Sequence, residues 1–481
     1  MTATDRAHRR HARAPLAVAA LLAALAALFA ACGAADPPSQ PTPAPTATAT
    51  ATPTAPAPAP TATPNLAVLL QDGGIGLIQI AYDRLLDEYI RPLEHTPLLN
   101  AAWDGLQQEA QRQGITPPPR PRFDGDRTAA FVAFAQSYVP FANALNDPTQ
   151  VRFAAIRNMA ASLNDCHTFF LNPVASETLI ETRAGKGSVG IGIEVQGLPP
   201  YVSEVIAGGP ADRAGIRTGD RILSVEGVDT SAIGPAGAYD LINGDEGTTV
   251  AVTLRRPGEE GTIALTMTRA RVVPMPVESR MLEGGLGYVR IRNFIDGGVK
   301  EDLERALQDF HRQQARGWII DLRGNPGGRL DSPAISLFVR EGVIVRDRGR
   351  NGKLEEIRAT GDLLPAIPPV VLLTNDRTGS VSEIFAAALK EYGIAYVIGT
   401  NTNGCVGYTD VRELGDGSSL AVTTHEHLGP VTNAPLNGIG VQPDLLVGRS
   451  EHDIANARDP QLDAAISHLL GQPALSGSTA P

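Results

Sequence analysis

The 481-residue sequence contains only three cysteines, Cys32, Cys166 and Cys405, and they lie far apart along the chain. So few cysteines argue against a disulfide scaffold. Basic residues are outnumbered, with 41 Lys and Arg against 52 Asp and Glu, and they form no basic stripe. Because phosphate binding needs clustered positive charge, the composition argues against nucleic acid as a partner.

The apolar run near the N-terminus is also short. It extends from Leu16 to Ala31, fewer than the roughly 20 residues that span a bilayer, and it follows several arginines and ends at Cys32. Residues 1–32 resemble a bacterial lipoprotein signal, which implies a lipid anchor on Cys32 and a membrane-attached, extracytoplasmic protein. The alternative is a plain secretory signal that is cut near the same place. Both interpretations predict export.

A segment with little charge and no apolar periodicity follows at residues 33–64, where Pro, Thr and Ala dominate. Such a composition cannot form a core, and it favours an extended chain of about 3.1 Å per residue, which would reach up to about 90 Å. We interpret it as a stalk. The last residues, 471–481, are expected to be a disordered tail.

The rest of the chain can bury a core, since 43% of all residues are hydrophobic. Residues 65–178 have helical apolar spacing and predict a helical domain, whereas residues 179–272 contain short β runs separated by glycines. Residues 273–470 alternate strands with helices, which predicts an α/β layer with ligands at the carboxyl ends of its strands. The fold class is therefore multidomain α/β.

Two motifs of the α/β segment follow predicted strands. Asp321–Gly328 is a strand end that enters a glycine-rich turn, whose backbone N–H groups can stabilise an oxyanion. Thr378–Ile384 is a loop that places Ser380 just before a helix. Free amides and the positive end of a helix dipole favour negative charge there, so the position suits a nucleophile.

The string from Gly209 to Gly227, GPADRAGIRTGDRILSVEG, closely resembles the PDZ domains of bacterial exported proteases. PDZ domains bind a chain terminus as an added strand and hold its carboxylate with amides of a glycine-rich loop, here Ser188–Gly192. The resemblance implies polypeptide C-termini as partners. The residues expected to bind the peptide are Val189, Gly190, Ile191, Gly192 and Ile193.

Together, the PDZ string and the two motifs resemble the carboxyl-terminal processing, or tail-specific, serine peptidases over nearly all of residues 70–470. The resemblance implies an N-terminal helical domain, an inserted PDZ domain and a peptidase core of the ClpP/crotonase type. It implies unfolded or C-terminally exposed polypeptides as substrates and no cofactor. By motif, Ser380 is the nucleophile, and the amides of Gly327 or Gly328 and of Val381 form the oxyanion hole.

The chain departs from this family at the general base. Cys405 stands where lysine-dependent members have a lysine, so a serine–lysine dyad is excluded. In the tricorn-like branch of the superfamily, the segment that here reads Leu163–Thr168 supplies a catalytic histidine, which corresponds to His167. Imidazole titrates in the useful range and can deprotonate a serine. Asn437, where that branch has a glutamate, can orient the ring.

The sequence leaves alternatives open. A chain that has lost its base could serve only as a PDZ scaffold that binds C-termini, or Cys405 could itself be a nucleophile with His167 as its base. A Cys166–Cys405 disulfide would occlude the site, and we expect the two thiols to be unpaired. His425 and His427 lie on one face of a predicted strand but lack a third ligand, so no metal site is predicted.

Overall fold

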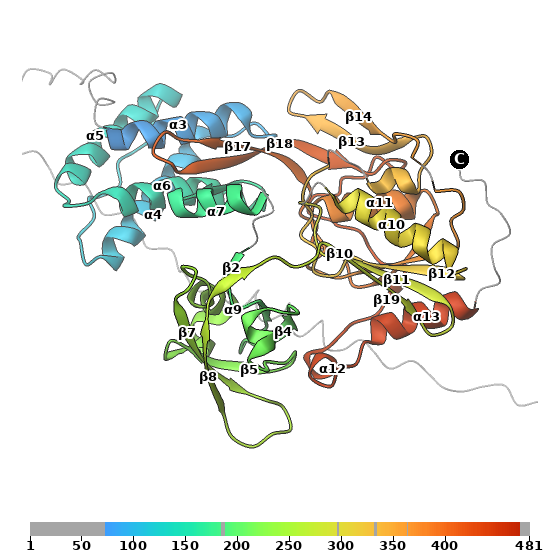
Figure 1. Ribbon diagram of the computed structural model, residues 1–481. Coiled ribbons are helices and arrows are strands. Elements are labelled where there is room, and N and C mark those ends of the chain that lie inside the picture. The colour runs from blue at the N-terminus through green and yellow to red at the C-terminus, as the bar shows by residue number, and fades with distance from the viewer. Residues whose placement is uncertain (1–72, 184–187, 296–297, 331–333, 363, 472–481) are drawn as a thin grey trace, which may run out of the picture. The chain divides into compact units, whose positions relative to one another are not determined.

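The computed structural model describes residues 73–183, 188–295, 298–330, 334–362 and 364–471 (Figure 1). The predicted signal peptide, the anchor at Cys32, the stalk and nearly all of the predicted tail lie outside these ranges. Within them, no helix combines the length and apolar character needed to cross a bilayer.

The N-terminal part of the described chain is helical, as predicted. Its helices are α3 (Gly73–Glu88), α4 (His95–Arg112), α5 (Arg127–Asn143), α6 (Thr149–Ala161) and α7 (Pro173–Arg183), with the short strand β1 (Phe169–Leu171) before α7. Their apolar faces bury Trp103, Tyr82 and Phe134 in one cluster. These side chains stack or meet edge to face with neighbouring aromatic rings, which fixes how the helices pack.

This helical core is completed by a distant hairpin. Strands β17 (Gly407–Glu413) and β18 (Ser419–Leu428) reach across to the helices, and Leu414, Leu420 and Val422 are buried in the same cluster (Figure 1). The helical domain predicted from the sequence, residues 65–178, does not include this hairpin. Helical periodicity cannot reveal that a strand from another part of the chain fills the remaining apolar face.

The segment predicted to be a PDZ domain is a small β structure with its own core. Its strands and helices are β2 (Ser188–Gly190), β3 (Ile193–Gln196), β4 (Tyr201–Val205), α8 (Pro210–Arg213), β5 (Arg221–Val225), β6 (Val228–Asp229), α9 (Thr230–Ile242), β7 (Thr249–Arg255), β8 (Ile263–Thr268) and β9 (Ala270–Val272). The chain is interrupted within the residues predicted to bind the peptide, because Gly192 has a φ of +79°. Strand β2, which contains Val189 and Gly190, pairs with β9 instead of extending β3. Strand β3 lies at the edge of its sheet, which has the order β3-β4-β5-β7-β8.

The peptidase core contains a sheet of order β10-β11-β12-β15-β16-β19, parallel except for the β10–β11 pair. Its strands are β10 (Val277–Leu282), β11 (Leu286–Ile291), β12 (Gly317–Asp321), β15 (Val370–Thr374), β16 (Ala395–Gly399) and β19 (Leu445–Leu446). One face packs on α10 (Val299–Arg312), η1 (Ala334–Leu337) and α11 (Val381–Glu391), and the other on α13 (Pro460–Gly471). Parallel strands covered on both faces read as continuous apolar runs, which is why β12 and β15 were predictable from the sequence.

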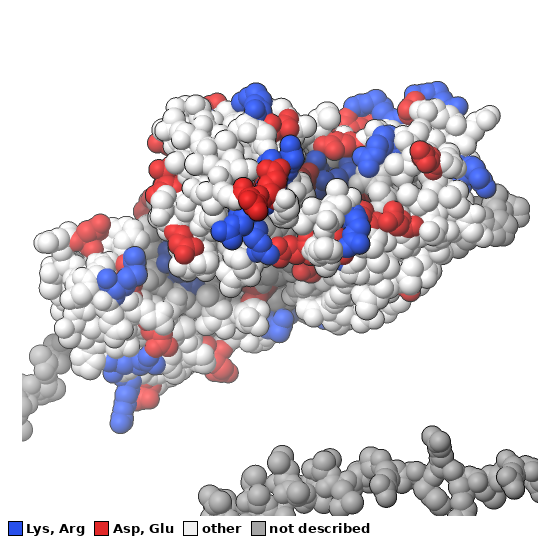
Figure 2. All heavy atoms as spheres, turned by 90° about the horizontal axis from the view of Figure 1, so that it is seen from below, with Lys and Arg blue, Asp and Glu red and all other residues white. Residues whose placement is uncertain are grey.

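A second sheet joins the core to the helical part. Strand β18 pairs with β1, β17 and β13 (Val343–Gly349), and β13 pairs with β14 (Leu354–Arg358). A short helix, α12 (Glu451–Ala455), precedes α13. The face seen in Figure 2 carries basic and acidic side chains interspersed, with no broad area of one sign.

Candidate active site

Ser380 stands at the N-terminus of α11, at the carboxyl edge of β15. Its backbone has φ 54° and ψ −123°, a conformation that non-glycine residues rarely adopt. The neighbouring loop makes this conformation possible, because the N–H of Gly379 donates to the carbonyl of Asn325 at 2.9 Å and the N–H of Ser380 donates to that of Cys405 at 2.9 Å. A strained residue held by surrounding hydrogen bonds is typical of a functional position.

Glu383, one turn into α11, holds the backbone of Ser380 and the loop of Cys405 in place. Its fully buried carboxylate accepts hydrogen bonds from the N–H groups of Ser380, Gly404 and Cys405 at 3.0, 2.7 and 3.0 Å, and from the Thr402 hydroxyl at 2.5 Å. Burial nevertheless raises the pKa of Glu383 above its usual value, because desolvation outweighs these hydrogen bonds. Glu383 therefore ties the nucleophile's loop to the loop that carries Cys405.

The glycine-rich turn lies directly against Ser380. A Cβ on Gly327 would lie 2.6 Å from the Cβ of Ser380, so only glycine fits there. The N–H of Gly327 donates to Oδ1 of Asn325 at 2.9 Å, which removes this amide from the expected oxyanion pair. The N–H groups of Gly328 and Val381, by contrast, donate to no residue in the described part of the chain. Of the two glycines that the sequence left open, Gly328 has the available amide.

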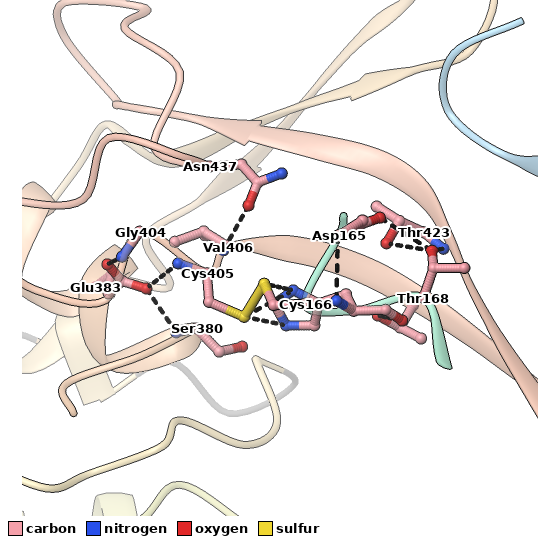
Figure 3. Close-up of a disulfide and its surroundings, with 12 residues drawn as sticks. Asp165, Cys166, Thr168, Ser380, Glu383, Gly404, Cys405, Val406, Thr423 and Asn437 are labelled. Carbon is pink, nitrogen blue, oxygen red and sulfur yellow. Dashed lines mark hydrogen bonds between the residues drawn. A yellow bond between two sulfur atoms is a disulfide. The ribbon is translucent and has the colours of Figure 1, made fainter. Parts of the chain in front are cut away.

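The prediction that Cys166 and Cys405 are unpaired is wrong. They form a disulfide, with Cα atoms 6.0 Å apart across a sequence separation of 239 residues (Figure 3). Cys166 lies between α6 and β1, and Cys405 lies in the loop after β16. Sequence alone could not bring them together, because their proximity depends on β1 pairing with β18. In this state Cys405 has no thiol to act as a nucleophile.

The disulfide also determines what surrounds His167. Nδ1 of the imidazole lies 3.4 Å from Sγ of Cys166 and 3.3 Å from Sγ of Cys405. Burial lowers the pKa of His167, opposed by the Asp165 carboxylate, so the ring is held in its neutral form. No hydrogen bond joins His167 to Ser380 in the described structure.

Asn437 does not contact the imidazole through a hydrogen bond either. Its Oδ1 accepts the N–H of Val406 at 3.2 Å, next to Cys405 (Figure 3). The expected chain of hydrogen bonds from Ser380 through His167 to Asn437 is therefore not assembled in this state.

Ser380, His167 and Cys405 line one cavity of about 1400 Å³. Side chains from PDZ strands β3 and β4, including Glu194 and Tyr201, line the same cavity. An ion pair of 2.8 Å joins Glu194 to Arg377, three residues before Ser380. The edge strand of the PDZ sheet and the predicted nucleophile therefore line one cavity, whereas the residues predicted to bind the peptide, Val189–Ile193, are not among those that line it.

Among the described residues, the metal-ligating side chains that cluster in a group of three are Cys166, His167 and Cys405. Both sulfur atoms are used in the disulfide, so this group cannot hold an ion in the oxidised state. His427 is buried 3.4 Å from Asp347 on β13, and His425 hydrogen-bonds to Thr424 at 3.0 Å.

Glu383 is the important residue that our sequence analysis missed. Ser380 and Glu383 have the Ser-x-x-Glu spacing of a helix capping box, a signal that was present in the motif. The structure uses this spacing to hold the Ser380 amide, and the same carboxylate reaches the Cys405 loop.

Comparison with known proteins shows the family of the chain. The family model "Peptidase family S41" matches residues 285–447, and a PDZ-domain model matches residues 201–256. A carboxyl-terminal-processing protease of Picosynechococcus is 32% identical over 336 residues, which cover 67% of this chain and 80% of that protein. The chain belongs to peptidase family S41.

Other members of the family support this placement. The carboxy-terminal processing protease CtpA of Bacillus subtilis is 31% identical over 321 residues, which cover 66% of this chain and 67% of that protein. The solved structure of a photosystem II D1 C-terminal processing protease aligns with a TM-score of 0.53 at 25% identity, over 85% of this chain and 98% of that one. Mature CPAF, at 14% identity and a TM-score of 0.51, shares the fold. This S41 chain is thus a serine-type peptidase relative with a PDZ domain.

Proposed function

We propose that this protein is an exported serine peptidase that captures polypeptide C-termini with its PDZ domain and cleaves them by acyl transfer at Ser380. The observation that carries the proposal is the conformation of Ser380. Its positive φ at the start of α11 and the unused amides of Gly328 and Val381 beside it match what a nucleophile and an oxyanion hole require.

The PDZ domain supports C-terminus recognition. Strand β3 (Ile193–Gln196) is the edge of its sheet, so an extended peptide can add to it as a further strand. The N–H groups of Ile191 and Gly192, just before β3, donate to no group in the described residues, while both carbonyls accept hydrogen bonds from elsewhere in the domain. These two amides are therefore free to hold a terminal carboxylate.

In the proposed reaction, Ser380 Oγ attacks the carbonyl carbon of the scissile bond while His167 takes its proton. The amides of Gly328 and Val381 stabilise the oxyanion, and His167 returns the proton to the leaving amine. Water then hydrolyses the acyl-enzyme in the reverse roles. Burial keeps the imidazole neutral, as a base must be, but it has to move from the sulfur atoms to reach Ser380.

Two further features support export. The arginine-rich start and apolar run before Cys32 favour a lipid-anchored protein, and a disulfide is typical of an oxidising compartment.

The second candidate is a PDZ scaffold without catalysis, and one observation favours it. The family lysine position is Cys405, which is closed in the disulfide, and the described structure brings no general base to Ser380. Loss of one triad member leaves only about 10³–10⁴-fold acceleration over water, too little for peptide hydrolysis.

Hydrolysis of an unfolded protein with a hydrophobic C-terminus distinguishes the two. The wild type should cleave it under at least one redox condition, whereas Ser380→Ala and His167→Ala should not. Binding of a labelled C-terminal peptide, with its C-terminally amidated form as a matched control, tests the PDZ domain separately. Carboxylate-dependent binding without any cleavage would establish the scaffold.

A further inference from the structure

The Cys166–Cys405 disulfide is attached directly to the nucleophile's loop. The carbonyl of Cys405 accepts the N–H of Ser380 at 2.9 Å, and its own N–H donates to Glu383 at 3.0 Å. Figure 3 shows the bond with Ser380 and Glu383 on one side and Asp165 and Thr168 on the other. The position that holds the family's general base is therefore bonded covalently to the residue that precedes His167.

The intact disulfide keeps the imidazole against sulfur. Nδ1 of His167 lies within 3.4 Å of both Sγ atoms, and Nε2 lies 4.0 Å from Sγ of Cys405. Disulfide sulfur is a poor hydrogen-bond acceptor, so it cannot orient the ring as a carboxylate or carbonyl would. The backbone next to His167 is anchored at Thr168, whose hydroxyl donates to Asp165 and contacts Thr423. The backbone is therefore fixed while the imidazole ring lies against the sulfur atoms and not at Ser380.

The bond is open to chemical attack. Cys166 is exposed, Cys405 is half-buried, and Cys405 lines the same cavity of about 1400 Å³ as Ser380. A disulfide that only stabilised the fold would be expected away from a substrate cavity, and buried. A disulfide with one exposed cysteine beside an imidazole is instead typical of a bond that exchanges with thiols.

We propose that the Cys166–Cys405 disulfide is a redox gate on this site: the peptidase is inactive while the bond is intact and becomes active when a dithiol reduces it. The inference rests on the proposed function, because it describes the regulation of Ser380. It also explains how a chain without the family lysine can retain a base, since reduction releases His167 from the sulfur pair.

The reaction balances as two thiol–disulfide exchanges. A thiolate of the dithiol attacks Sγ of exposed Cys166, the protein S–S bond breaks, and Cys405 leaves as a thiolate that takes up a proton. The second thiol of the reductant, as its thiolate, attacks its own sulfur in the mixed disulfide and releases Cys166 as a thiolate, which is protonated in turn. The protein gains two electrons and two protons, and the dithiol becomes a disulfide.

The test measures two properties of the full chain after oxidation and after anaerobic reduction with a dithiol. The first is hydrolysis of an unfolded polypeptide, and the second is covalent labelling of Ser380 by a fluorophosphonate. Reduction should raise both rates in the wild type by about 10²-fold, the lower end of what a positioned base contributes. Mass shift on alkylation reports the state of the bond in each sample.

Variants separate the gate from other effects of reductant. Cys166→Ser removes the partner without touching the Cys405 loop, so it should be active in both conditions and insensitive to the dithiol. Cys405→Ser should behave in the same way. Cys32→Ser, which removes the cysteine outside the disulfide, should respond as the wild type does, and Ser380→Ala should be neither active nor labelled.

The outcomes are distinguishable. Equal labelling and hydrolysis in the oxidised and reduced wild type, or lower rates after reduction, would overturn the gate but leave the peptidase. Loss of all activity in Cys405→Ser, with Ser380→Ala still active, would also overturn it and identify Cys405 as the nucleophile. Labelling that rises on reduction without any hydrolysis would overturn the proposed function and would show that the disulfide controls the reactivity of Ser380 alone. If neither rate is detectable in any form, both proposals fail.

Discussion

The two sides of the candidate site are built differently. On the nucleophile side, Ser380 is held by backbone hydrogen bonds to buried loops and by the carboxylate of Glu383. On the base side, His167 contacts a disulfide between exposed Cys166 and half-buried Cys405, and Asn437 accepts a hydrogen bond from a backbone amide instead of orienting the imidazole. The first side is held by hydrogen bonds, one of them to the carbonyl of Cys405, whereas the second depends directly on a covalent bond that thiols can reverse. We therefore place the proposed redox control on the base side of the site.

The largest expected effect comes from removing that bond. In the chain-entropy model, a cross-link that spans 239 residues stabilises the fold by about 5 kcal/mol. The Cys166→Ser/Cys405→Ser double variant should therefore unfold at lower denaturant concentration than the oxidised wild type, and the reduced wild type should match the variant. Denaturant titration measures both. An unchanged midpoint would mean that the base side is as preorganised as the nucleophile side.

Gly327→Ala tests the nucleophile side. The new Cβ would lie 2.6 Å from Cβ of Ser380 and 2.7 Å from the nitrogen of Val381, so both the nucleophile and an oxyanion amide must shift. We expect kcat of the reduced enzyme to fall by about 10²–10³-fold, the effect of losing one oxyanion donor. Gly324→Ala is the matched control, because Gly324 also has a positive φ but has no atom within 4 Å of its added Cβ. Equal loss of kcat in both variants would show that backbone strain, not displacement of Ser380, is responsible.

Glu383→Gln should weaken the same side by destabilising the fold. The carboxamide presents N–H groups to a site where amides of Ser380, Gly404 and Cys405 need acceptors, and a lost hydrogen bond to a buried charged group costs about 2–3 kcal/mol. Unfolding by denaturant measures this cost. Glu391→Gln at the other end of α11 is the control: it also accepts amide hydrogen bonds, from Val431 and Thr432, but it is only half-buried, so its loss should be smaller.

The sequence predicted the nucleophile side well because the residues of that side lie close together along the chain. Ser380 stands between strand β15 (Val370–Thr374) and helix α11, just before the helix, as the motif Thr378–Ile384 predicted. Periodicity and a contiguous motif contain this information. The base side is made by segments that are far apart, and no local pattern indicates that Cys166 reaches Cys405. The same reason explains why the β17–β18 hairpin in the helical core was not predicted.

A smaller effect is expected from Asn437→Ala. The side chain holds only the N–H of Val406, at 3.2 Å, so its loss should cost about 1 kcal/mol of stability. Because Asn437 does not orient His167, the acid limb of the pH profile of kcat/KM should stay where it is in the reduced wild type. A displaced acid limb would show that Asn437 turns to the imidazole once the disulfide opens.

The smallest expected effect is the dependence of stability on pH that comes from His167. It is small because burial and the Asp165 carboxylate shift the pKa of the imidazole in opposite directions. Burial dominates and lowers its folded-state pKa below the unfolded value near 6.5. The unfolded chain therefore binds more protons between these two values, and the oxidised protein should lose stability as the pH falls from about 6.5 through the folded pKa. His167→Gln should lack this component, whereas His311→Gln, at an exposed position on α10, should keep it. If reduction frees the imidazole from its buried contact with sulfur, the component should shrink in the reduced wild type, because a more hydrated ring has a pKa closer to that of the unfolded chain.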